Sequence, residues 1–498
     1  MTAKCRRHTI DPTVVVTRIF DEAAPHEKGT TWPAMRYKNV VCIYPYRKEL
    51  KAVGFLPPIG LEYIASAIED LVESLVILDL RHEKEPLSSF ITDSTDLVLI
   101  SCNWDLEPDF VKGVISSIPG HIAVVVGGRH ATENVNEFLA LMPNIDAIVR
   151  GDGEEAVREI VQHGFSEDIA GLSLRKDGRV IHADTRKLTP VRNDSFPNRS
   201  LRRYTYLVTL DEFETGIEMD LMLGSRGCPW NCKFCDFKFN PLGEKRKWST
   251  REPESVFEEI KSIKARVIGF ADDIFTADMN WVERLCDLLI EGNVKKKYVI
   301  NARLEIARRP DVLRKMYKAG FMVFLMGVES AHDKTLKSMR KGFDTKKIRE
   351  YFNVLNQFDF VYHCYFIIGN IGETREEILE IVTFGRELGV DTLGLSVLRA
   401  TKFSPLRDMV KDLDDYHIDE KSGKVYSDML SVDDLQQLRR NVNRSFFSNA
   451  HILRVMRKTV IHRVLTAGLV GKLILYTARR KVRKIAVKRG IRMGEVVR

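Results

Sequence analysis

Three of the eight cysteines in this 498-residue chain lie within eight residues of one another, in the segment SRGCPWNCKFCDF. Cys228, Cys232 and Cys235 form the spacing C-x3-C-x2-C in a loop, and Pro229 and Asn231 favour an open turn in which the sulfurs converge. A closed zinc site needs four ligands, and neither a second CxxC nor a histidine follows within 60 residues. The spacing therefore favours a [4Fe–4S] cluster with one iron open to a small molecule. A zinc site and simple packing of buried cysteines are the alternatives.

The cysteine loop follows the first of six predicted strands. All six are apolar runs, and each except the last is clearly followed by a helical stretch; they cover 219–225, 267–273, 298–304, 322–329, 363–370 and 392–398. Six βα units in series predict a TIM-type barrel or partial barrel over 216–401. The C-terminal region, 402–498, shows helical periodicity without a strand pattern, and Ser431 is a candidate helix N-cap.

A second set of apolar strands precedes the cysteine loop. Five runs alternate with amphipathic helices, at 39–45, 74–80, 96–102, 121–128 and 145–151. Such a pattern predicts a doubly wound, Rossmann-like parallel sheet over 39–165, so the whole chain belongs to the α/β class. Residues 1–38 are interpreted as an N-terminal extension, and 166–215 as a linker that contains a small hairpin.

Open parallel sheets bind ligands outside the carboxyl ends of their strands. Small residues at several of the predicted strand ends would let a large flat ligand approach, and a nucleotide remains one alternative. The candidate contacts at this edge are Pro57, Gly60, Ser101, Gly127, Gly128, His130, Gly151 and Glu154.

The positive charge of the chain is concentrated at its C-terminus. Residues 451–498 contain 14 Lys and Arg and one acid, Glu495, whereas the rest of the chain carries a net charge of −5. This basic tail is interpreted as a helical cap or as a contact with an anionic membrane surface, and nucleic acid is the least favoured partner. No apolar run is long enough for a membrane span or a secretory signal, so we expect a cytoplasmic protein, either free or peripheral to a membrane.

Together, these features resemble the radical S-adenosylmethionine (SAM) superfamily, and more closely its cobalamin-binding branch, over residues 39 to about 450. The cysteine motif carries the resemblance to the superfamily. The segments VGGRHATENVNEFL and IVRGDGEEAV resemble turns of the cobalamin domain, whereas GFADDIFTAD, MGVESAHDKTLKSMRKG and YFIIGNIGETREEI resemble strands of the barrel.

The resemblance implies three cofactors: a [4Fe–4S] cluster on the three cysteines, SAM on the open iron, and cobalamin at the edge of the first sheet. It implies SAM contacts from Asp272, Asp273, Arg303, Glu329, Ser330 and Gly369. The Gly-Gly-Glu motif of many members is replaced here by Ala271-Asp272-Asp273, and these acids are alternatively helix-starting residues. A structural ion pair of Arg303 with Glu329, and a simple turn at Gly369, would explain those residues without SAM.

No histidine of the first domain lies in the axial-ligand motif D-x-H-x-x-G, so cobalamin is expected without a histidine ligand, with His130 as a contact only. His363, Cys364, Tyr365 and Phe366 are interpreted as core residues. The implied reaction is methylation of an unactivated carbon of a small-molecule or lipid substrate, with flavodoxin or ferredoxin as reductant. The alternatives are radical cyclisation or oxidation without methyl transfer, on a tetrapyrrole or lipid, and a non-catalytic sensor of cobalamin or redox state.

Overall fold

The computed structural model describes residues 36–462, apart from gaps at 49–53, 177, 195, 211–212, 236–238 and 421, together with 466, 468–472 and 475–476. Residues 1–35 of the expected extension, and most of the basic tail after residue 462, lie outside the described residues.

The first sheet has the strand order β2-β1-β3-β4-β5-β6-β7. All five predicted strands form, and they pair in parallel. Their bounds are β1 Asn39–Tyr44, β2 Ser74–Asp79, β3 Leu97–Ser101, β4 Ala123–Gly127 and β5 Ala147–Val149. The hairpin predicted in the linker pairs antiparallel with β5 and extends this sheet, as β6 Leu172–Lys176 and β7 Arg179–His182.

Helices cover both faces of this sheet. Alternate residues of a strand point to opposite faces, so Val40 packs with α1 and α5, and Val41 packs with α2 and α4. The helices are α1 Ile59–Ser66, α2 Pro108–Ser116, α3 Arg129–Glu133, α4 Val135–Leu141 and α5 Glu154–His163. The order 2-1-3-4-5 of the parallel strands is that of a doubly wound sheet with its switch point between β1 and β3.

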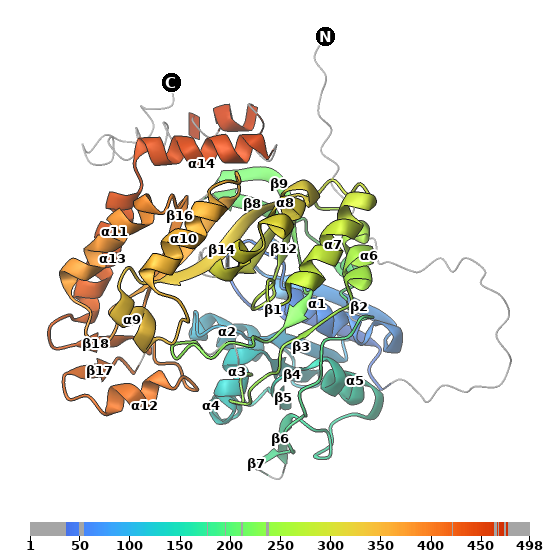
Figure 1. Ribbon diagram of the computed structural model, residues 1–498. Coiled ribbons are helices and arrows are strands. Elements are labelled where there is room, and N and C mark those ends of the chain that lie inside the picture. The colour runs from blue at the N-terminus through green and yellow to red at the C-terminus, as the bar shows by residue number, and fades with distance from the viewer. Residues whose placement is uncertain are drawn as a thin grey trace, which may run out of the picture. The chain divides into compact units, whose positions relative to one another are not determined.

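The second sheet has the order β16-β15-β14-β13-β12-β9-β8 (Figure 1). The six predicted strands form and pair in parallel, whereas β8, Leu207–Leu210, adds an antiparallel edge. The bounds of the six are β9 Phe213–Met222, β12 Val267–Phe270, β13 Lys297–Ala302, β14 Phe321–Glu329, β15 Val361–Ile368 and β16 Thr392–Val397. Because β16 and β8 are the two ends of an open strand order, the sheet is the partial barrel that the sequence predicts.

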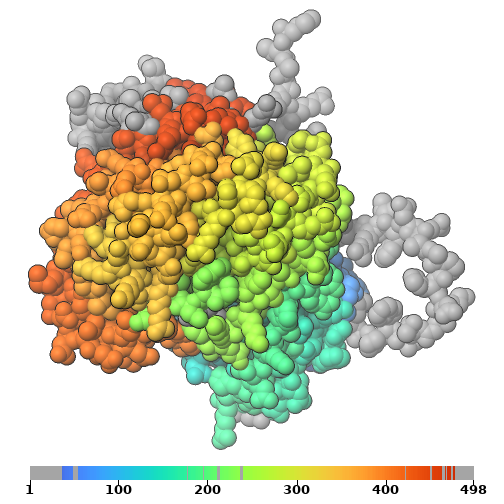
Figure 2. All heavy atoms as spheres, in the orientation of Figure 1, coloured from blue at the N-terminus to red at the C-terminus, as the bar shows by residue number. Residues whose placement is uncertain are grey.

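The outer face of the partial barrel carries its hydrophobic core (Figure 2 shows the packed molecule in the same orientation). Buried side chains of the strands pack there with those of α6 Pro253–Ser262, α7 Met279–Glu291, α8 Pro310–Ala319, α9 Asp333–Ser338, α10 Thr345–Leu355 and α11 Arg375–Glu387. This packing fixes the carboxyl ends of the strands, where a barrel places its chemistry.

The C-terminal region is mostly helical, as predicted, but it also contains a short hairpin of β17, Tyr416–Ile418, and β18, Val425–Ser427. Three-residue strands are too short to show a period in the sequence. The helices are α12 Leu406–Lys411, α13 Val432–Phe446 and α14 Asn449–Ile461. Ser431 caps α13 through a capping box with Asp434, which confirms the predicted N-cap. Within the described part of the chain, no helix has the length and apolar character needed to cross a membrane.

Candidate functional site

The cysteine loop follows β9 and the short β10, Ser225–Arg226, at the carboxyl end of the barrel strands. Cys232 is buried, and Cys228 and Cys235 are half-buried. The loop is anchored to the barrel, because the Lys233 amide donates to the Met339 carbonyl at 3.0 Å. Among the described residues, no three His, Cys, Asp or Glu side chains lie close enough to share one metal ion. A cluster makes a different demand, since each thiolate binds a different iron.

The two acids after β12 brace the turn that leads into this loop. The Asp272 carboxylate accepts hydrogen bonds from the Gly224 amide at 2.8 Å and the Ser225 hydroxyl at 2.5 Å. Complete burial raises the pKa of Asp272 to about 7. Asp273 accepts a hydrogen bond from the Gly227 amide at 2.9 Å. Both acids therefore hold backbone just ahead of Cys228, and Asp273 also lines a cavity described below.

Arg303 lies against the cysteine loop. Its guanidinium carbon is 4.6 Å from the centre of the Trp230 ring, and Nη1 is 3.9 Å from the Cys232 sulfur. The same guanidinium pairs with Glu305 at 2.7 Å. A cation that is held beside a ligand sulfur can tune the reduction potential of a cluster. Because Arg303 pairs with Glu305, the ion pair with Glu329 that the sequence left open does not form.

Glu329 ends β14 and pairs instead with Lys341, at 2.8 Å between carboxylate and ammonium. Both side chains are buried. Glu329 has a φ of +72°, which is strained for a residue with a β-carbon, and strained residues of this kind cluster at functional sites. Ser330 is fully buried beside it, and its hydroxyl accepts a hydrogen bond from the His332 amide at 3.1 Å.

Gly369 follows β15 with a φ of +76°, so the turn itself requires glycine. A β-carbon at this position would lie 2.9 Å from a methyl group of Leu435 on α13. The side of Gly369 that lacks a side chain therefore meets packed protein, and this contact accounts for the glycine without a ligand.

A cavity of about 270 Å³ opens at the carboxyl ends of β3, β4 and β5 and the start of α1. Six of the eight residues predicted at this sheet edge line it: Gly60, Ser101, Gly127, Gly128, Gly151 and Glu154. The other two do not. Pro57 is buried ahead of α1, and His130 packs its ring against Phe138 and lies 3.1 Å from the Asn134 amide nitrogen.

A second cavity, of about 260 Å³, adjoins the first and shares four lining residues with it: Arg129, Asp152, Arg226 and Pro241. It extends to Ser225 and Asp273 of the barrel. Ion pairs line the boundary, since Arg226 contacts Glu154 at 2.8 Å and Arg246 contacts Asp152 at 2.6 Å. The edge of the first sheet and the end of β12 therefore line two adjoining cavities with charged side chains between them.

The sequence interpretation missed the inner face of the barrel. Cys364 and Phe366 are fully buried in the outer core, as predicted, but the intervening residues of β15 point to the other face. Tyr365 is 38% exposed and His363 is half-buried, and a β-carbon at Gly394 of β16 would lie within 2.8 Å of both rings. The prediction of a core role was therefore wrong for these two residues, and strict alternation along the strand was the signal that could have revealed it.

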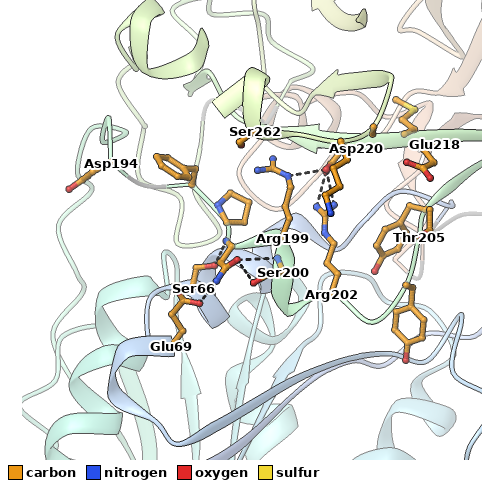
Figure 3. A pocket seen from close by; sticks show the side chains of 18 residues that line it. Ser66, Glu69, Asp194, Arg199, Ser200, Arg202, Thr205, Glu218, Asp220 and Ser262 are labelled. Atoms are coloured by element: carbon orange, nitrogen blue, oxygen red, sulfur yellow. Dashed lines mark hydrogen bonds and ion pairs between the residues drawn. The ribbon is translucent and has the colours of Figure 1, made fainter. Parts of the chain in front are cut away.

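The sequence also carries no sign of the charged network that joins the two sheets. Arg202 donates to Glu62 of α1 at 2.6 Å. It also donates to Asp220 of β9 at 2.7 Å, and Arg199 pairs with the same Asp220 at 2.9 Å (Figure 3). Arg199 and Arg202 line a cavity of about 800 Å³. This network ties the helix that borders the first cavity to the strand that carries the cysteine loop.

Comparison with protein families matches residues 222–385 to the radical SAM superfamily and residues 50–161 to the B12 binding domain. The chain is 27% identical over 354 residues to the uncharacterized methyltransferase PH0819 of Pyrococcus horikoshii, which covers 67% of this chain and 74% of that protein. It is 26% identical to an anaerobic magnesium-protoporphyrin IX monomethyl ester cyclase of Synechocystis, over 61% of this chain and 62% of that one.

The fold is similar to that of the radical SAM methyltransferase TsrM from Kitasatospora setae, a structure with cobalamin and a [4Fe-4S] cluster bound. The TM-score is 0.65 at 15% sequence identity, with 83% of this chain and 90% of that chain covered. The two matched segments follow one another in the chain, which therefore combines a B12-binding domain with a radical SAM domain.

Proposed function

We propose that this protein is a cobalamin-dependent radical SAM methyltransferase that acts on an unactivated carbon. The main support is that the edge of the B12-binding sheet and the end of β12 line two adjoining cavities that share four lining residues. The match to a methyltransferase over two thirds of the chain adds to it. The substrate is a small molecule or a lipid.

Cys228, Cys232 and Cys235 would hold three irons of the cluster and leave the fourth for SAM. When bound, the cluster and SAM supply a radical that removes a hydrogen atom from the substrate, and cobalamin supplies the methyl group. The residues of the chain position and shield this chemistry. Arg303 contacts the Cys232 sulfur, while Asp272 holds the turn ahead of the loop.

We assign the remaining predicted residues to two ligands, SAM and cobalamin. SAM would contact Asp273, Glu329 and Ser330 at the ends of β12 and β14, with Gly369 shaping the turn after β15. Cobalamin would bind at the edge of the first sheet, where the predicted residues Gly60, Ser101, Gly127, Gly128, Gly151 and Glu154 line the first cavity. The glycines keep side chains out of that space, as a large flat ligand requires. Pro57 and His130 would border this ligand from outside the lining.

The first experiment removes one thiolate. We expect Cys232→Ala, after anaerobic reconstitution, to lose most bound iron and all SAM cleavage, measured as 5′-deoxyadenosine. The matched control is Cys286→Ala, since Cys286 is a fully buried cysteine of α7 outside the loop. Normal iron and SAM cleavage in Cys232→Ala would contradict the assignment of the cluster.

A second candidate is a radical cyclase or oxidase without methyl transfer, supported by the similarity to the magnesium-protoporphyrin cyclase. Both candidates need a one-electron donor, for which we propose flavodoxin or ferredoxin. The products formed from SAM distinguish the two candidate reactions. Methyl transfer consumes one SAM as methyl donor and a second as radical source, so S-adenosylhomocysteine and 5′-deoxyadenosine both accumulate. The cyclase yields 5′-deoxyadenosine alone.

A further inference from the structure

Helix α14 lies beside the barrel (Figure 1), and its polar side chains contact the barrel. The Lys458 ammonium donates to the Asp391 carboxylate at 2.7 Å, and His451 Nε2 donates to the Asp391 carbonyl at 2.7 Å. One turn beyond Lys458, His462 Nε2 donates to the Asp359 carbonyl at 2.8 Å. Lys458, His451 and His462 are all buried. The helix is thus fixed to the barrel by hydrogen bonds and ion pairs.

The opposite side of α14 is apolar and faces solvent. Ile452 is 48% exposed, Leu453 66% and Val460 45%, and Met456 is half-buried between them. At 3.6 residues per turn, these four residues lie within about 100° of the helix circumference, opposite the buried polar side chains. A surface helix of a globular protein normally has the reverse arrangement, with the apolar stripe inside. This apolar stripe, defined as Ile452, Leu453, Met456 and Val460, contributes nothing to the core.

The sequence that follows the helix indicates what covers the stripe. Residues 463–498 contain 11 Lys and Arg and a single acid, Glu495. An anionic bilayer satisfies both features, because the stripe enters the boundary between headgroups and acyl chains while the cations attract the lipid phosphates. A second copy of the chain would bring two strongly positive segments together, and a nucleic acid would leave the stripe in water.

We propose that α14 is an interfacial helix that seats its apolar stripe in an anionic lipid bilayer. Asp359 lies two residues before β15 and Asp391 lies directly before β16, so α14 lies at the amino ends of these barrel strands. The cysteine loop lies at the carboxyl ends. A strand of eight residues spans about 26 Å, so the docked membrane leaves the candidate site open. The proposal does not rest on the proposed reaction.

The experiment is co-sedimentation of the full-length protein with vesicles of phosphatidylcholine alone or of phosphatidylcholine with phosphatidylglycerol. We expect binding to the anionic vesicles in low salt. The double variant Leu453→Glu and Val460→Glu should bind about tenfold more weakly, which corresponds to about 1.4 kcal/mol. The control is Leu379→Glu together with Met429→Glu, since both residues are exposed and apolar and neither lies on α14. It adds the same charge and should bind within about twofold of the wild type.

The following outcomes would overturn the proposal. Equal binding of the α14 variant and its control would mean that the tail acts by charge alone. A dimer of the wild type that dissociates in the α14 variant, in the absence of vesicles, would assign the stripe to contact with a second copy.

Two controls apply to both variants. Their circular dichroism and their 5′-deoxyadenosine formation should match those of the wild type. Loss of SAM cleavage in the wild type itself would refute the proposed reaction and leave the vesicle result unaffected.

Discussion

Replacing Arg202 by Met should reveal how strongly the charged network joins the two sheets. Arg202 is 12% exposed, and its partners Glu62 and Asp220 are 1% and 4% exposed, so water cannot replace the lost cation. Removing one member of a buried ion pair costs about 3–5 kcal/mol when the other charge stays buried, as Glu62 would, whereas Asp220 keeps its pair with Arg199. We expect a loss of this size in the free energy of unfolding. The control is Arg192→Met, since the pair of Arg192 with Asp194 is about two-thirds exposed and contributes roughly 0–1 kcal/mol.

The pH dependence tests the physical reason for this loss. Burial already raises the pKa of Glu62, and the hydrogen bonds and charge of Arg202 oppose that effect. Without Arg202, burial and repulsion from Asp220 raise the folded-state pKa further, so the fold loses stability as pH rises above the ordinary carboxyl value. The loss of unfolding free energy in Arg202→Met should therefore be small near pH 4 and largest at neutral pH.

The assay is urea unfolding of the wild type and both variants at several pH values, followed by tryptophan fluorescence and circular dichroism. Adding Glu62→Gln to Arg202→Met should recover part of the loss, because it removes one uncompensated charge. A deficit below about 1 kcal/mol, or one that does not change with pH, would refute the reasoning. Equal losses in Arg202→Met and Arg192→Met would do the same.

Gly128→Ala should lower the free energy of unfolding by roughly 1–3 kcal/mol and abolish cobalamin binding. The reason is that Gly128 has a φ of +97° and that a β-carbon there would lie 2.6 Å from the Cys102 carbonyl oxygen. Urea unfolding and the visible absorbance of bound cobalamin measure both effects; Gly113→Ala, in a helix with open space around it, is the control that should retain the cofactor. Burial raises the pKa of Asp272 from 3.8 to about 7, so wild-type stability should fall as pH rises between these values, by at most about 1.4 kcal/mol per pH unit. Asp272→Asn should lack this part of the slope, and an unchanged slope would mean that another group titrates.

The elements of both sheets could be predicted because their signals are local. Uniform apolar runs such as those of β1 and β4 are typical of parallel strands with both faces covered, and all eleven parallel strands formed where the sequence predicted them. The elements that were missed carry weak local signals. β8 is a four-residue edge strand, and β17 and β18 have three residues each, so none is long enough to show a period.

The candidate site likewise contains features with a local signal in the sequence and features without one. By itself, the sequence determined the three-cysteine loop, the order of the domains and six residues of the first cavity, because each follows from spacing or from position at a strand end. The sequence did not determine which charged side chains pair with one another. Arg202 reaches Glu62 across 140 residues, and Arg303 pairs with Glu305 while Glu329 pairs with Lys341. Such choices depend on which side chains meet once two sheets and their helices have packed. For the same reason only the tertiary structure reveals that α14 presents its polar side to the protein: the helical period shows two faces, and contact with Asp359 and Asp391 decides which one is buried.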